Sequence, residues 1–441
     1  MNGLINKIED KIFIFLIKKY WKIISSKYSF YLRESPKLFF GTIPIINIKY
    51  WSKILSDYYY SKTVIKFKPY SINNFSDFDY SIEDILKHYK KKYVPKRYLL
   101  KYPMLFLFDY SLKRFNIFHL SFKGIGVYEK YGIDEVKFIK LFGSKIVMIP
   151  YGADFLQYNK LDNYSLRHGL MSHYPKSIFQ EDAIEKIVKY WVAGSDIVIA
   201  SNILEGKFNW NLIPFVNLSL NLDQWKPKTN YNSNNGLNGT IKIAHCPNHR
   251  SIKGTEFIIQ AIDKLKSEKL KVELVLFEGV QNKEVLRFLK EEADILIEQL
   301  FSGYGLNGLE GMSLGVPVIS SLSSNSRNKM YRRFSYLNEC PILSSSPEEL
   351  TNDLRILVKN PELRKNLGEN GRLYAEKYHS EKSAMFMFRN IYKKIWHNID
   401  VDLMNMYNPL NPDSYNNQSP LINHPLVENK IPKELMEKLN K

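Results

Sequence analysis

The sequence predicts an α/β fold made of two doubly wound, Rossmann-like halves. Short apolar runs alternate with stretches of helical periodicity, which is typical of parallel sheets covered by helices on both faces. One polar segment rich in Asn and Gly, Lys226–Gly239, interrupts this alternation, and the pattern restarts after it. A chain of 441 residues with 44% hydrophobic and 14% aromatic residues has the apolar side chains that two cores require. Two domains joined by a polar linker are therefore expected.

The first half begins with a helix and continues with short strands. Apolar residues at steps of three and four predict a helix over residues 4–24, with lysines interspersed. A second helix is predicted at 45–55, after a strand that ends in Gly41 and Thr42. The strands predicted in this half span residues 37–42, 63–67, 117–120, 145–149 and 198–200.

The second half repeats the pattern more regularly. Its predicted strands span 241–245, 272–277, 295–298 and 318–320, and its predicted helices 254–267, 283–290 and 308–314. A capping box at 346–349 starts a helix that runs to about residue 359, and helices continue to residue 396. The predicted units are an N-terminal domain (1–225), the linker (226–239), a C-terminal domain (240–385), and a closing helix with a loosely packed tail (386–441). In such sheets, ligands bind outside the carboxyl ends of the strands, so we expect a site in a cleft between the halves.

The surplus of basic residues limits the kinds of partner that the protein could bind. There are 63 Lys and Arg against 45 Asp and Glu, a net charge of +18, and residues 1–100 hold 19 of the basic residues and 8 of the acidic ones. Nucleic acid, an anionic membrane surface, or compositional bias without a partner could each explain this surplus. The chain has no recognisable nucleic-acid-binding module, so no nucleic acid partner is expected. The basic amphipathic helix at 4–24 either packs on its domain or lies on a membrane.

The small number of cysteines and the lack of a signal-peptide pattern predict a cytoplasmic protein. Two cysteines, Cys246 and Cys340, are too few for a disulfide scaffold or a zinc ribbon and favour a reducing compartment. No apolar run approaches the roughly 18–20 residues that span a bilayer, and the start lacks a signal-peptide pattern.

A basic loop follows the first strand of the second half. Arg250 and Lys253 stand just before a helix that Gly254 and Thr255 open. Two cations beside a helix N-terminus suit a diphosphate, although a solvated basic loop has the same appearance. The neighbouring His245, Cys246 and His249 lack further ligand-type partners, so no metal site is expected.

A glycine-rich loop follows the third strand of the second half. Gly303 and Gly305 let the backbone approach a ligand closely, and the N–H groups of Leu306 and Asn307 would point at an anion. Glu310 lies one helical turn further on, where a carboxylate can accept hydrogen bonds from a ribose diol. An ordinary surface position on a helix is the alternative for this glutamate.

Taken together, these segments resemble the GT-B glycosyltransferases, specifically the retaining, nucleotide-sugar-dependent group called family four. The carrying segments are PNHRSIKGT at 247–255, ADILIEQL at 293–300 and GYGLNGLEGMSLGVPVI at 303–319. The resemblance covers residues 241 to about 396, and the first hundred residues match only loosely. It implies a GT-B fold, with two Rossmann-like domains facing across a cleft.

The resemblance also implies roles. Arg250 and Lys253 would neutralise the donor diphosphate and stabilise the charge on the leaving group, and Glu310 would hold the donor ribose. The other residues expected around the donor are Gly41, Thr42, His249, Gly279, Val280, Gln281, Gly303, Tyr304, Gly305, Leu306 and Asn307, of which 279–281 would face the base. One position departs from the pattern: Ser302 stands where the family commonly has a second glutamate, which puts the donor sugar in doubt.

A second constellation lies in the N-terminal half. Tyr151 and Asp154 occupy a corner where the family often has a His-Gly-x-Asp-like element facing the reaction centre. Tyrosine can donate a hydrogen bond but is a poor base near neutral pH. His119, Arg167 and His168 are further acceptor-side candidates, although a histidine in a core or a loop is an equally good interpretation.

The function that the resemblance implies is retaining transfer of a hexose-type sugar from a UDP- or GDP-sugar, with no metal and no cofactor. The acceptor would be a lipid-linked surface polysaccharide at the inner face of the cytoplasmic membrane, and the basic N-terminal half would meet anionic lipid there. The alternative is a catalytically silent GT-B subunit that supports a partner transferase. Ser302 and Tyr151 favour that alternative.

Overall fold

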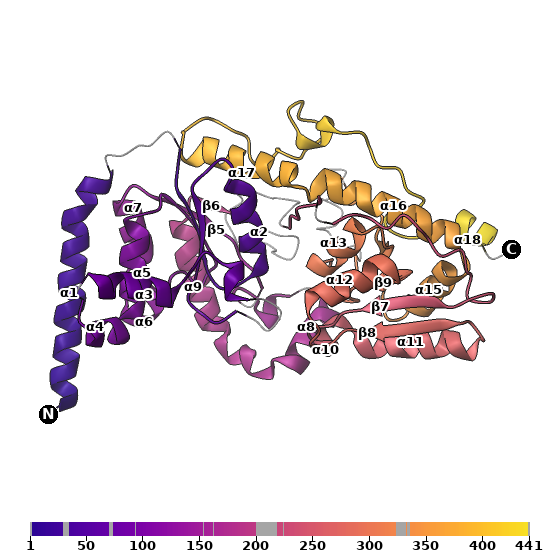
Figure 1. Cartoon of the computed structure of the whole chain (residues 1–441), viewed down its shortest axis with the longest axis horizontal. Coiled ribbons are helices and arrows are strands. Elements are labelled where there is room, and N and C mark those ends of the chain that lie inside the picture. Colours follow the sequence, from indigo (N-terminus) through magenta and orange to yellow (C-terminus); the bar gives the residue numbers. More distant parts are fainter. Residues whose placement is uncertain are drawn as a thin grey trace.

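A computed structural model of the chain contains two parallel sheets, each with helices on both sides (Figure 1). The residues described are 2–29, 35–69, 74–92, 94–152, 154–161, 163–199, 218–223, 225–322, 332 and 336–439. The N-terminal domain and the C-terminal domain lie next to each other along the long axis of the molecule. This confirms the predicted α/β class with two Rossmann-like domains, which is the GT-B architecture.

The N-terminal sheet has the strand order β3-β2-β1-β4-β5-β6, with every neighbouring pair parallel. Its strands are β1 (Leu38–Thr42), β2 (Ser61–Ile65), β3 (Tyr80–Ser81), β4 (Ile117–Leu120), β5 (Lys145–Met148) and β6 (Ile197–Val198). Its helices are α1 (Asn2–Ser29), α2 (Ile46–Leu55), α3 (Ile82–Lys91), α4 (Lys96–Lys101), α5 (Pro103–Leu112), α6 (Val127–Tyr131), α7 (Glu135–Leu141), α8 (Tyr164–His173) and α9 (Glu181–Gly194). The strand order reverses between β1 and β4, which places the switch point there.

The C-terminal sheet has the order β11-β10-β9-β7-β8, again with parallel neighbours, and its switch point lies between β7 and β9. Its strands are β7 (Ile241–His245), β8 (Val272–Leu276), β9 (Ile295–Ile297), β10 (Val318–Ser320) and β11 (Leu343–Ser344). Its helices are α10 (Arg250–Lys253), α11 (Thr255–Ser267), α12 (Asn282–Glu291), α13 (Leu306–Ser313), α15 (Leu350–Lys359), α16 (Pro361–Tyr378), α17 (Glu381–Ile395) and α18 (Lys433–Leu439). Short 3₁₀ segments lie at Phe75–Asp77, Tyr158–Lys160, Pro175–Gln180 and Tyr415–Gln418.

Several predicted elements differ in detail from the structure. The edge strands β3 and β11 have two residues each, which is too short for a period-of-two pattern to predict them. The helix predicted from the capping box at 346 begins later, at Leu350, because residues 347–349 form a turn. The strand predicted at 198–200 is described only as far as residue 199.

The C-terminal segment packs more closely than the tail we predicted. Tyr407 and Tyr415 are buried, and the ring of Phe386 on α17 contacts both. The aromatic side chains that composition assigned to a loose tail therefore extend the core of the C-terminal domain.

The two domains contact each other in more than one place among the described residues. Helix α17 returns to the N-terminal domain, where Phe388 meets the ring of Trp51 edge-on and the Tyr392 hydroxyl lies 2.9 Å from Nε2 of His119. At the other end of the interface α8 packs on α10, because Gly169 has no side chain to keep them apart. A Cβ at that glycine would lie 2.9 Å from the carbonyl oxygen of Ser251. No helix among the described residues is long and apolar enough to cross a membrane.

Candidate functional site

The candidate site lies at the carboxyl ends of β7 and β9, where two loops leave the switch point of the C-terminal sheet. The first loop runs through His249 into α10, and the second runs through Gly303–Gly305 into α13. The N-terminal domain approaches the same place through α2. Burial raises the pKa of the Tyr50 hydroxyl on α2, and the negative charge of Glu310 raises it further.

Glu310 is a buried carboxyl group on α13 and not a surface residue. It is 4% exposed and accepts a hydrogen bond of 3.1 Å from Nδ2 of Asn282. Burial raises the pKa of Glu310 to about 7, against the effect of hydrogen bonds from Asn282 and Asn307. The carboxylate form of Glu310 can accept hydrogen bonds from a diol, and such bonds would stabilise a charge that burial leaves poorly solvated.

Lys253 is predicted to neutralise the donor diphosphate, but in this structure its charge is already paired. Its ammonium group donates to Oε1 of Glu298 at 2.9 Å and to Oε1 of Gln299 at 3.1 Å. Both partners are buried and come directly after β9. A diphosphate would meet Lys253 only in competition with this internal carboxylate.

Glu298 also holds the glycine-rich loop. The backbone N–H of Gly305 donates to its two oxygens at 3.1 and 3.0 Å, and the Ser320 hydroxyl donates to Oε2 at 3.3 Å. A Cβ at Gly308 would lie 3.1 Å from Oε2, so the carboxylate lies against the first turn of α13. The sequence alone predicted no role for Glu298. Its position at the carboxyl end of a buried strand at the switch point was the available signal.

Arg250 is likewise engaged with carboxylates. Its Nε donates to Glu256 at 2.8 Å and its Nη1 to Glu278 at 3.0 Å. Its side chain is partly exposed, so both ion pairs exchange readily with a bound anion. Arg250 is therefore more accessible to a bound anion than Lys253, whose side chain is 16% exposed.

His249 joins the two domains at the site. Its Nε2 lies 2.8 Å from the hydroxyl of Tyr174, and its ring centroid lies 4.2 Å from that of His173. Burial and the neighbouring His173 lower the pKa of His249, which favours the neutral imidazole at physiological pH. The end of α8 therefore reaches the loop expected to bind the donor.

In the glycine-rich loop, the Tyr304 side chain contacts other residues of the C-terminal domain. We expected Tyr304 to lie against the donor, but its hydroxyl lies 2.6 Å from that of Tyr336 and 2.8 Å from Nε2 of His379. It anchors the loop to the end of α16, and burial raises its pKa well above the usual value. Leu306 and Asn307 form the first turn of α13, as predicted.

The loop predicted to face the base is open. Gly279 has a positive φ of 67° and is exposed, as is Gln281, while Val280 is half-buried. The next residue, Asn282, is the one that reaches Glu310. Sequence reasoning missed it, because a single Asn at the start of a helix looks like an ordinary cap.

His119 is a buried residue whose ring is held by contacts within the fold. Its ring stacks on Phe40 at 4.0 Å, and both ring nitrogens are engaged, Nδ1 with the Phe39 carbonyl at 3.1 Å and Nε2 with Tyr392. Burial lowers its pKa to about 3, so the ring stays neutral. His119 also lines a small cavity together with Gly41 and Tyr151, so its acceptor-side assignment stays a prediction.

Asp154 stabilises the loop in which it lies through hydrogen bonds from backbone N–H groups. It is fully buried and accepts from the backbone N–H groups of Phe122 at 2.9 Å, Tyr151 at 3.1 Å and Gly152 at 3.2 Å. Burial raises its pKa to about 6 despite these bonds. Asp154 therefore positions Tyr151, and the predicted direct contact with substrate does not fit a carboxyl without exposed surface.

Tyr151 is half-buried and lines a small cavity of about 150 Å³ at the carboxyl ends of β1, β4 and β5. Gly41 lines the same cavity, whereas Thr42 is buried and donates to the carbonyl of Gly124 at 2.7 Å. Arg167 covers the ring of Tyr164, and His168 is exposed. The cavity is the N-terminal counterpart of the site around Glu310.

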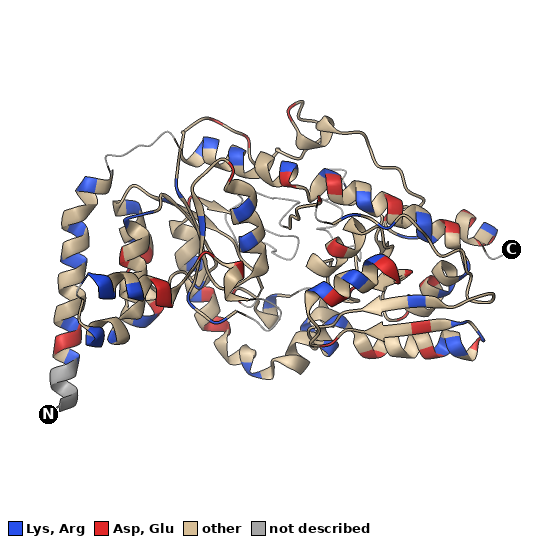
Figure 2. Ribbon diagram, in the orientation of Figure 1, with Lys and Arg blue, Asp and Glu red and all other residues tan. Residues whose placement is uncertain are grey.

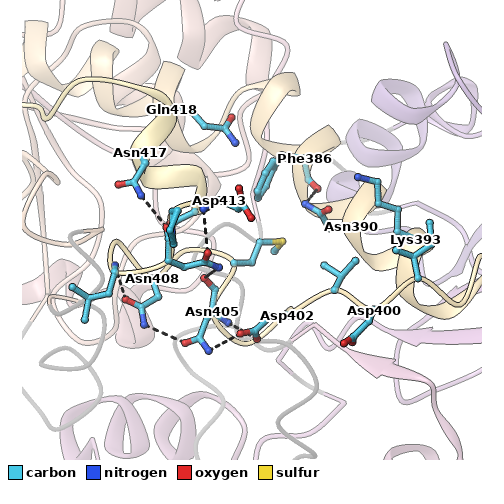
Figure 3. A pocket seen from close by; sticks show the side chains of 17 residues that line it. Phe386, Asn390, Lys393, Asp400, Asp402, Asn405, Asn408, Asp413, Asn417 and Gln418 are labelled. Atoms are coloured by element: carbon cyan, nitrogen blue, oxygen red, sulfur yellow. Dashed lines mark hydrogen bonds between the residues drawn. The ribbon is translucent and has the colours of Figure 1, made fainter.

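A larger hollow of about 1000 Å³ lies elsewhere, between α17 and the C-terminal segment (Figure 3). Its polar side chains bond mainly to one another, as in the 2.8 Å bond from Asn405 to Asp402. It lies at the carboxyl end of neither sheet. Among the described residues, no group of three or more His, Cys, Asp or Glu side chains could hold a metal ion.

Comparison with known proteins gives a limited match. No protein-family model matches the chain. An uncharacterized glycosyltransferase of Methanocaldococcus jannaschii is 28% identical over 112 residues, which are 25% of this chain and 31% of that relative. The match thus spans about a third of the relative's length. Over that stretch the chain is glycosyltransferase-like, and membership of family four stays a prediction.

Two solved structures are similar to this chain at TM-scores below 0.5. MnaA of S. aureus, in a structure with UDP, has a TM-score of 0.46 at 12% identity over 83% of this chain and 98% of that one. A mutant of the Thermobaculum terrenum O-GlcNAc transferase has a TM-score of 0.43 at 10% identity, over 86% and 73%. Similarity at this level carries no argument about activity.

Proposed function

We propose that the protein is a retaining glycosyltransferase that moves a sugar from a UDP- or GDP-sugar to a lipid-linked surface polysaccharide of the capsule, O-antigen or lipopolysaccharide type. The observation that carries this proposal is that the loops leaving β7 and β9 at the switch point bring the buried Glu310 on α13 and the cations Arg250 and Lys253 on α10 to the same edge of the sheet. A carboxylate for the ribose and cations for the diphosphate are the parts that such a donor needs. The similarity to a glycosyltransferase over a quarter of the chain supports the class.

The proposed reaction needs no protein nucleophile. The bond between the anomeric carbon and the diphosphate breaks, the acceptor oxygen bonds to the same face, and its proton passes to the departing phosphate oxygen. A carboxylate nucleophile would need free oxygen atoms facing the sugar. Three carboxyl groups, those of Glu298, Glu310 and Asp154, are instead buried and accept hydrogen bonds from the protein, which supports a route without such a nucleophile. Arg250 and Lys253 would stabilise the charge on the leaving group, and neither a metal nor a cofactor has a step in the proposal.

We place the protein in the cytoplasm, at the inner face of the membrane where a lipid-linked acceptor would lie. The surplus of basic residues in the first hundred positions supports this location.

The test is binding of nucleoside diphosphates to the purified chain. Calorimetric titration with UDP, GDP, CDP and ADP should show binding of at least one, and chromatography should detect slow hydrolysis of the matching sugar donor. Glu310→Ala should weaken binding at least tenfold, about 1.4 kcal/mol, whereas the exposed Glu284→Ala should not. Absence of nucleotide binding by the unmodified protein would refute the proposal.

A second candidate is a catalytically silent GT-B subunit. Its support is that the cations of the site are neutralised internally, Lys253 by Glu298 and Arg250 by Glu256 and Glu278, together with Ser302. This candidate predicts that the chain binds no nucleotide but raises the activity of a partner transferase. Donor hydrolysis by the chain alone would exclude it.

A further inference from the structure

Helix α1 is apolar on two faces, and the domain covers one of them. On the inner face Trp21 is fully buried, and its Nε1 donates to Oδ1 of Asp109 at 2.9 Å. The ring of Phe13 stacks on Tyr102 with centroids 4.4 Å apart. Asp10 accepts from the hydroxyl of Tyr102 and pairs with Lys101 on α4. These contacts fix the rotation of α1 on the domain.

The outer face carries a second apolar stripe. Five large apolar side chains on it are each more than half exposed: Ile8, Ile12, Phe15, Leu16 and Ile23. At about 100° per residue, they fall within a stripe roughly 100° wide. A helix that serves only to cover its domain would carry polar residues there, so this face fits a partner that is apolar itself.

Lysines frame this stripe. Lys11 and Lys22 lie along one border and Lys19 lies within it, all three exposed. The acidic residues of α1, Glu9 and Asp10, lie near its N-terminal end, and Figure 2 shows basic residues along the rest of the helix. The neighbouring α4 adds the exposed side chains of Lys96, Arg97 and Leu100. A positively charged frame around apolar side chains is complementary to anionic lipid.

We propose that the outer face of α1 docks the protein on an anionic membrane surface. The helix is 28 residues long, about 42 Å, and runs along the outer edge of the N-terminal domain (Figure 1), so it can lie flat in the headgroup region while both domains stay in water. This inference deepens the proposed function by naming the surface through which the enzyme meets a membrane. It rests on that function only for the nature of the acceptor.

The test is flotation of the full chain with vesicles of phosphatidylcholine alone or mixed with phosphatidylglycerol. The protein should float with the anionic vesicles and stay in solution with the neutral ones. The double variant Phe15→Ser/Ile23→Ser should lower partitioning at least tenfold, and Lys11→Gln/Lys22→Gln should lower it in a manner that added salt mimics. Leu410→Ser, which removes an equally exposed apolar side chain from the C-terminal segment, is the matched control and should float like the unmodified protein.

Two outcomes would overturn the inference. One is equal flotation of Phe15→Ser/Ile23→Ser and the unmodified chain. The other is a dimer in analytical ultracentrifugation that this double variant dissociates, without flotation of either form, which would make the stripe an interface between two copies. Nucleotide binding in solution needs no vesicles, so loss of flotation with intact nucleotide binding refutes only the docking surface.

Discussion

Glu310→Gln should make the protein more stable at pH 8 while weakening nucleotide binding. The pKa of this carboxyl rises from 4.5 to about 7 because the folded protein buries it. The folded state therefore binds the proton more tightly than the unfolded state, and ionisation costs stability as pH rises between these two values. At 1.36 kcal/mol per pKa unit, the full cost above pH 7 is about 3 kcal/mol. Glutamine keeps the acceptor for Asn282 and carries no charge.

The assay is thermal unfolding of both forms between pH 4.5 and 8.5. The gain should be near zero at the lowest pH and grow to about 3 kcal/mol at pH 8, which is about 6–12 °C in the unfolding midpoint for a domain of this size. Glu284→Gln on α12 removes an exposed carboxyl and should show no such gain. A difference between Glu310→Gln and the unmodified protein that stays constant with pH would refute the reasoning, because burial would then not penalise the charge.

Three further predictions concern the contacts around the site. Glu298→Gln should lower the free energy of unfolding by about 1–3 kcal/mol, since it removes the counter-ion of the partly buried Lys253, and it should tighten binding of a nucleoside diphosphate in calorimetry. Tyr392→Phe should cost about 1 kcal/mol in urea unfolding, because it leaves Nε2 of His119 without its donor; an unchanged midpoint would contradict this. Gly169→Ala should lower stability by about 1–3 kcal/mol, measured in the same way, since its Cβ would push α8 from α10.

The alternation of short apolar runs and helical stretches was enough to predict both sheets. Parallel strands with helices between them follow from that pattern, and the carboxyl ends of β7 and β9 then place Lys253 and Glu310 at the same edge of the sheet. The edge strands were missed because two residues carry no periodicity, and the packing of the tail was missed because aromatic residues in an Asn-rich segment do not show what they contact.

The sequence by itself therefore determined the class of fold and the expectation of a site at the carboxyl ends of the strands, because these depend on local periodicity. The strand order, and with it the two switch points, came from the tertiary structure. Only the tertiary structure decided which group each side chain meets. Tyr392, which contacts His119, lies 273 residues away in the sequence. Lys253 is paired with Glu298 and does not stand unpaired in the site. One apolar face of α1 is exposed, whereas the domain covers the other. Such pairings depend on how distant elements pack, and a hydrophobic pattern reports that a face is apolar without reporting what covers it.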